Sequence, residues 1–94
     1  MNRTIRKAQF HRENGTAIRG QDLLAMPTTS LLKVFQEARR IHARNNEALA
    51  AMTCDERQSK AAQTMMHQRS VAALIFNESA VMIVERQLGM GCEP

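Results

Sequence analysis

Residues 28–52 read TTSLLKVFQEARRIHARNNEALAAM, and their apolar side chains recur at alternating spacings of three and four. Residues at these spacings share one face of an α-helix, so the pattern predicts an amphipathic helix from about residue 30 to the end of this stretch. Thr28, Thr29 or Ser30 can cap its start by accepting a hydrogen bond from an unpaired backbone N–H. The polar Asn45 within the stripe either is buried at a helix–helix seam, where it can fix register and oligomer state, or is a surface residue where the stripe drifts. The expected stripe contains Leu31, Val34, Phe35, Ala38, Ile41, His42, Asn45, Ala48, Leu49 and Met52.

A second helix is expected directly after the first. Residues 53–56 (TCDE) match the capping box, in which the Thr hydroxyl and the Glu carboxylate each bond the other's backbone N–H. Helical apolar spacing continues from there to Leu88, and Gly89 is a typical helix C-cap. Two helices with a short joint form an antiparallel αα-hairpin. Two short strands remain an alternative within residues 71–84, which are also rich in β-branched side chains.

The segment before these helices is a basic arm without helical periodicity. Asn14 and Gly15 favour a tight turn, and the segments on either side alternate only weakly, so we expect either a short β-hairpin or an irregular arm. One helical turn before Pro27 can place Leu23 and Leu24 inward. The proline ends this turn, because the residue before a proline avoids the α region.

Chain length and composition predict one mainly α domain. Ninety-four residues suit a single domain with a thin hydrophobic core. We expect a basic N-terminal arm (residues 1–27), a helical hairpin (residues 28–89) and a flexible tail (residues 90–94). Oligomerisation is expected to complete the thin core.

The C-terminal half of the second helix is apolar on more than one side. A single shorter partner helix cannot cover both sides, so this half either packs against a second copy of the chain or offers an apolar surface to another protein. A homo-oligomer and a protein partner are therefore both expected. The predicted interface residues are Leu74, Ile75, Phe76, Val81, Met82 and Leu88.

The formal net charge is +4, from 13 basic and 9 acidic residues, and it is concentrated in the arm. A basic arm can attract nucleic acid or an acidic protein surface, and a second basic cluster lies on the first helix. Glu37 and Glu47 interrupt that cluster, and the chain offers no aromatic platform on which bases could stack. A nucleic-acid-binding regulator is therefore the alternative function. Its candidate contacts, or those to an acidic partner, are Arg3, Arg6, Lys7, Arg12, Arg39, Arg40 and Arg44.

No pattern of catalytic, metal-ligating or cofactor-binding residues is visible. His42 and His67 have no neighbouring ligands at zinc spacing, and the chain has no Gly-rich phosphate loop. Cys54 sits at an expected helix start, but no His or Asn that would activate it is adjacent, so we do not expect an enzyme. Cys54 and Cys92 are too few for a disulfide framework, and neither a signal sequence nor a membrane span is visible. We therefore expect free thiols and a cytoplasmic protein.

In size, helical hairpin and surplus apolar face, residues 28–89 resemble the small helical proteins that phages and prophages use to disable another protein, such as antirepressors. The resemblance rests on general make-up, without a family motif, and transfers no residue role. It implies a non-enzymatic interaction protein that inhibits or remodels a regulatory protein by occupying its surface.

Overall fold

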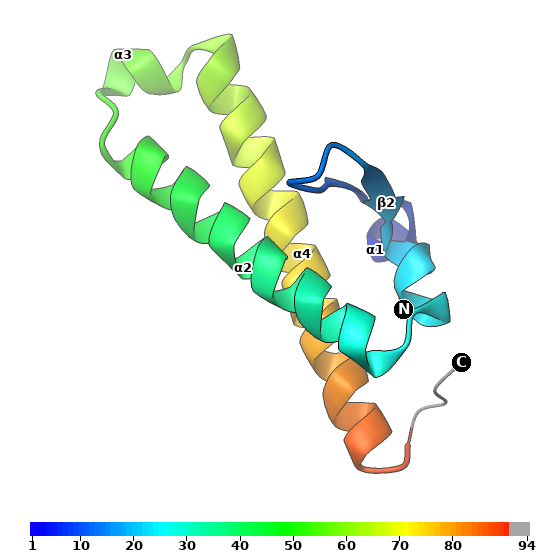
Figure 1. Ribbon diagram of the computed structural model, residues 1–94. Helices are drawn as coiled ribbons and strands as arrows, with labels where there is room; N and C mark the ends of the chain where they lie inside the picture. The colour runs from blue at the N-terminus through cyan, green and yellow to red at the C-terminus, as the bar shows by residue number, and fades with distance from the viewer. Residues whose placement is uncertain (91–94) are drawn as a thin grey trace.

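Two long antiparallel helices form the body of the protein, and short N-terminal elements pack along one side of them (Figure 1). The computed structural model describes residues 1–90. The elements, in chain order, are α1 (Arg3–Lys7), β1 (Gln9–His11), β2 (Ala17–Arg19), the 3₁₀ helix η1 (Gly20–Ala25), α2 (Thr28–Ala50), α3 (Cys54–Arg57) and α4 (Lys60–Gln87). The predicted mainly α hairpin is confirmed. The expected tail at residues 90–94 lies outside the described residues apart from Met90, as does Cys92.

Helix α2 has the buried stripe that the spacing predicted. Its buried apolar side chains are Leu31, Val34, Ala38, Ile41 and Leu49. Asn45 is buried with them, so the stripe does not drift to the surface there. The predicted cap is wrong, because Pro27 precedes the helix and residues 28–30 occupy its first turn. A proline suits this place, since its fixed φ matches the helix and the missing N–H would have no helical partner.

The joint between the two long helices is longer than predicted. The capping box is present: the Glu56 N–H donates to Thr53 Oγ1 and the Thr53 N–H donates to Glu56 Oε1, each at 3.2 Å. It opens only the single turn of α3, however. Ser59 caps α4 by accepting a hydrogen bond from the Ala62 N–H at 3.1 Å, so the second long helix begins later than expected.

Helix α4 is continuous through residues 71–84, so the alternative of two strands is wrong. Its buried side chains in this half are Val71, Ala72, Ile75, Ser79 and Met82. Ser79 fits among them because its hydroxyl donates to the Ile75 carbonyl at 2.7 Å. The prediction of Ile75 and Met82 as interface residues is wrong, because both side chains belong to the core of the single chain.

The arm contains a β-hairpin preceded by one short helix. β1 and β2 pair antiparallel, and the Arg12 N–H donates to the Thr16 carbonyl at 2.8 Å across a three-residue loop. Gly15 in this loop has a φ of 87°, in the left-handed region that such loops require of one residue. Asn14 does not share that conformation, so the turn is not the two-residue type that the Asn-Gly pair favours.

The arm covers one side of the helix pair. Phe10, 2% exposed, and Leu23, fully buried, belong to the same core as the side chains of α2 and α4. Leu24, which we expected to point inward, is 47% exposed, because successive residues of a 3₁₀ helix point about 120° apart. The sequence does not predict α1, which has no apolar stripe. Gly20 at the start of η1 lies so close to α1 that a Cβ there would overlap the Ile5 carbonyl.

Candidate protein-binding surfaces

The outer side of α4 carries a row of mostly apolar side chains, all exposed except the half-buried Leu74. We define it as the outer stripe, formed by Leu74, Asn77, Val81, Val84 and Leu88. Val81 and Val84 are 50% and 52% exposed, and Leu88 is 67% exposed. The residues of α4 that are buried against α2 lie on the opposite face of the helix, so the outer stripe points away from α2. Three predicted interface residues, Leu74, Val81 and Leu88, lie in this row.

A second surface, the interhelical groove, lies between α2 and α4. It is a depression of about 470 Å³ lined by Phe35, Arg39, His42, Ala43, Phe76, Asn77 and Ala80. The Phe76 ring centroid lies 6.4 Å from that of Phe35 and 5.4 Å from that of His42, both in edge-to-face geometry. All three rings are half-buried, so each keeps an open surface. Phe76 is the fourth predicted interface residue that the structure leaves accessible.

The groove lies on the side of the helix pair that the arm leaves bare. The residues of α2 and α4 that line depressions together with the arm include Ile41, Arg44, His67 and Val71, and none of them lines the groove. Arg39 is the only formally charged residue in the groove lining, and its guanidinium carbon lies 5.5 Å from the centroid of the Phe35 ring. An apolar groove with one cation suits an apolar ligand surface that carries a carboxylate.

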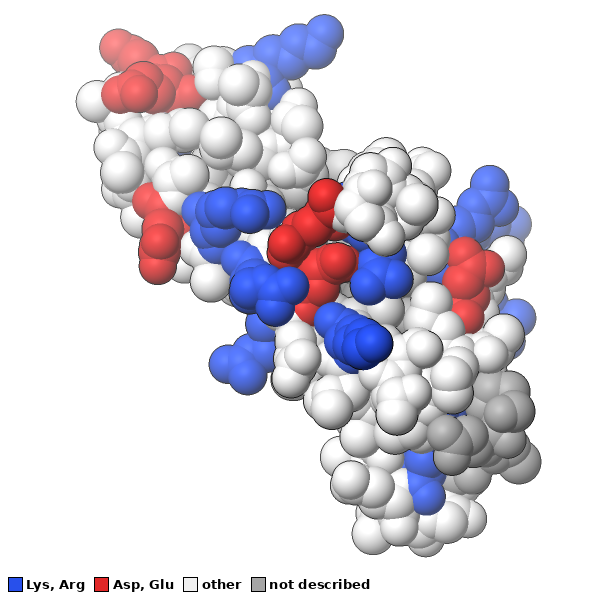
Figure 2. Space-filling model, in the orientation of Figure 1, with Lys and Arg blue, Asp and Glu red and all other residues white. Residues whose placement is uncertain are grey.

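The predicted basic residues fall into separate groups rather than one surface. Arg3, Arg6 and Lys7 lie on α1, whereas Arg39, Arg40 and Arg44 lie on α2. Two ion pairs connect the β-hairpin to α2: Arg12 Nε lies 2.8 Å from Glu37 Oε2, and Arg40 Nε lies 3.3 Å from Glu13 Oε1. Figure 2 shows acidic and basic side chains mixed in the middle of the face in view. On the same face, the end of the molecule where α2 begins and α4 ends carries almost no charged side chains.

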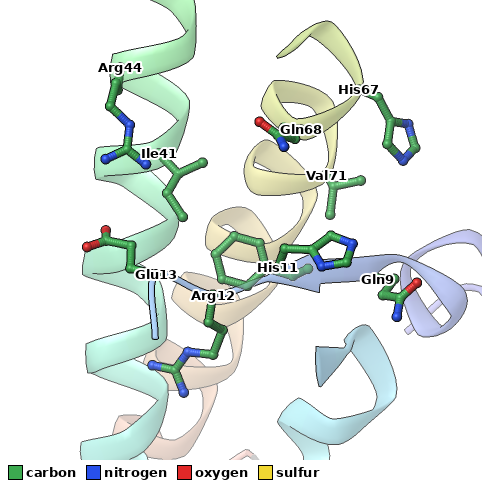
Figure 3. A pocket seen from close by; sticks show the side chains of 10 residues that line it. Gln9, His11, Arg12, Glu13, Ile41, Arg44, His67, Gln68 and Val71 are labelled. Atoms are coloured by element: carbon green, nitrogen blue, oxygen red, sulfur yellow. The ribbon is translucent and has the colours of Figure 1, made fainter. Parts of the chain in front are cut away.

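Another depression, of about 220 Å³, lies where β1 meets α2 and α4 (Figure 3). Its lining includes the buried apolar side chains of Phe10, Ile41 and Val71. Arg44 and His67 lie on opposite sides of it, so its polar groups do not converge on one point. In the part of the chain that the structure describes, no three His, Cys, Asp or Glu side chains are grouped to hold a metal ion.

Sequence reasoning did not identify the interhelical groove. It placed Phe35 and His42 in the buried stripe of the first helix, each directly after another apolar member. The first members, Val34 and Ile41, are buried, whereas the second members are half-buried and line the groove. Adjacent residues point about 100° apart on an α-helix, so such pairs span two faces. Repeated pairs in α2 are therefore the signal that could have revealed a second, half-open face.

Three further findings concern the functional class. No helix within residues 1–90 is long and apolar enough to cross a membrane. Cys54, at the start of α3, is an exposed free thiol. No protein-family model, curated protein or solved structure matches this chain.

Proposed function

We propose that this chain is a non-enzymatic interaction protein that binds another protein and inhibits or remodels it by occupying its surface. The observation that carries the proposal is the interhelical groove, in which the rings of Phe35, His42 and Phe76 stay partly open to solvent. A half-open apolar groove between two helices is the kind of site that accepts an amphipathic helix. Buried aromatic and Arg contacts also carry much of the binding energy at protein interfaces.

The residues that line the groove indicate the shape and charge that a partner needs. Ala43 and Ala80 have small side chains, so a partner helix can approach closely between α2 and α4. An apolar side chain of that helix would pack on the Phe76 ring. An Asp or Glu about one turn away would pair with Arg39, because a guanidinium matches a carboxylate in a two-bond geometry.

Exposed apolar side chains extend the groove at one end. Leu32 lies one turn before Phe35 on α2, and Val84 lies one turn after Ala80 on α4. They add contact surface for a partner helix longer than the groove itself. An antirepressor-like protein could act in this way, by covering a helix that a regulatory protein needs.

A nucleic-acid-binding regulator has less support than a protein-binding one. Arg12 and Arg40, two of its seven candidate contacts, already contact carboxylates of the same chain. A mixed-charge surface loses phosphate affinity, because each nearby carboxylate repels the phosphates that an arginine attracts. The basic residues of α1 belong to a separate element.

Affinity capture from the native cell with matched variants tests the proposal. Ala43→Arg would fill the groove with a long charged side chain, whereas Ala61→Arg makes the same change at an exposed site of α4 outside the groove. We expect a protein partner to be captured by the wild type and by Ala61→Arg, and at least about tenfold less by Ala43→Arg. Recovery of nucleic acid alone, or equal capture by both variants, would contradict the proposal.

A further inference from the structure

We propose that the outer stripe is the contact seam of a parallel, two-fold dimer, in which α4 of one copy lies against α4 of a second copy. The stripe residues from Leu74 to Leu88 are separated by three, four, three and four positions. This alternation is the pattern by which two helices pack along a common seam. Leu74, at the start of the seam, also lines a depression with α1 and β1, and Asn77 borders the interhelical groove. The remaining members, Val81, Val84 and Leu88, are exposed and lie away from the buried face of α4, so a second helix can approach them without displacing α2.

The two edges of the seam differ in charge, and this difference selects the orientation. Glu78 and Glu85 flank it on one edge, whereas Ala73, Ala80 and Gln87 flank it on the other. A parallel copy related by a two-fold axis places the acidic edge of each helix beside the uncharged edge of the other. An antiparallel copy places acidic edge beside acidic edge, which is repulsive.

The seam itself carries no charged side chain, so its burial leaves no charge unpaired. Asn77 is its one polar member. In a parallel dimer the amide of Asn77 meets the same amide of the second copy, and an amide both donates and accepts hydrogen bonds. In an antiparallel dimer Asn77 would face Val84 or Leu88 and stay unpaired, at a cost in free energy.

The length of the seam sets the expected affinity. From Leu74 to Leu88 the helix rises by about 21 Å. Two helices that meet over only this length bury less surface than a typical stable dimer, which buries about 800 Å² on each partner. We therefore expect a reversible dimer with a dissociation constant in the range of about 1 to 100 µM. The seam adjoins the interhelical groove and shares Asn77 with it. The dimer is nevertheless tested separately from the proposed function, because self-association of the purified chain needs no other protein.

Cysteine cross-linking distinguishes the two orientations. In a chain with Cys54→Ser and Cys92→Ser, Asn77→Cys and Leu88→Cys are each introduced singly, at exposed positions of the seam. A parallel dimer brings each new thiol opposite its own symmetry mate, so either variant alone should form a disulfide-linked dimer under mild oxidation. An antiparallel dimer would cross-link efficiently only when the two variants are mixed, and that result would overturn the parallel arrangement.

Sedimentation equilibrium between about 10 and 300 µM tests whether the dimer forms at all. We expect the average mass of the wild type to rise with concentration towards twice 10.6 kDa. Val81→Asp should remain a monomer with unchanged helix content by circular dichroism, because the side chain is half exposed in the single chain. Leu24→Asp, a matched change at a similarly exposed leucine of η1, should dimerise like the wild type. A wild type that stays monomeric throughout, or a dimer that Val81→Asp does not weaken, would overturn the proposal.

Discussion

The two sides of the helix pair carry similar side chains but differ in how completely the chain covers them. On one side the arm seals the core, and Phe10 and Leu23 are buried beneath it. On the other side Phe35 and Phe76 contact each other and remain half-open. The difference therefore lies in whether a covering segment is present, and not in the kind of residue. A surface that residues 1–90 leave uncovered in this way is available to a binding partner.

Removal of one phenylalanine from each side should give the largest contrast. Phe10→Ala should lower the free energy of unfolding by about 3 kcal/mol, because the ring is fully buried between arm and helices and leaves a cavity. Phe76→Ala should cost about 1 kcal/mol, since part of its ring is already exposed. Urea denaturation followed by circular dichroism measures both losses. Equal losses would mean that the covered and the bare side contribute alike to stability.

The junction between α1 and η1 should show the next largest effect. Gly20→Ala should cost about 2 kcal/mol, because the added Cβ collides with the backbone carbonyl of Ile5 and one of the two elements must move. Gly15→Ala is the matched control: it has open space around it but a positive φ, so it should cost about 1 kcal/mol. Thermal unfolding compares the two. A smaller loss for Gly20→Ala than for Gly15→Ala would show that the arm adjusts freely.

The sequence predicted the element types on the bare side well, but not the face that each helix turns inward. In α2 the spacing of Leu31, Val34, Ala38 and Ile41 specified both helix and buried stripe. In α4 eleven of the fourteen residues from Val71 to Val84 are apolar, so spacing alone could not choose between neighbouring faces. The buried face includes the polar Ser79, whose hydroxyl donates to the Ile75 carbonyl, and the spacing of apolar residues cannot reveal a buried position of this kind.

The arm was the less predictable region for a different reason. Its elements are short, and a two-stranded hairpin or a five-residue helix has little stability alone. They depend on contacts that are distant in sequence, such as the ion pair of Arg12 with Glu37 and the burial of Phe10 against the helices. The turn at Gly15 could be predicted from the local sequence, whereas the packing of the β-hairpin against α2 could not.

The two ion pairs between the hairpin and α2 should differ in strength. Glu37 is buried and its partner Arg12 mostly so, whereas Glu13 and Arg40 are both exposed. Glu37→Gln should therefore cost about 1 kcal/mol, and Glu13→Gln no more than about 0.5 kcal/mol. Urea denaturation at low and high salt measures both, and added salt should reduce only the smaller loss appreciably. The reverse order would show that the exposed pair holds the hairpin in place.

The smallest effect on stability should come from Arg39, the charged residue of the bare side. Its guanidinium lies over the Phe35 ring, a contact that contributes about 0.5 kcal/mol at an exposed site, so Arg39→Gln should leave the free energy of unfolding nearly unchanged. Binding of the captured partner should nevertheless fall about tenfold, because the carboxylate that we expect to enter the groove loses its cation. Arg44→Gln, on α2 but facing the covered side, is the control and should bind normally. If Arg44→Gln weakened binding as much as Arg39→Gln, the partner would be responding to the overall positive charge of α2, and the bare side would not be its site.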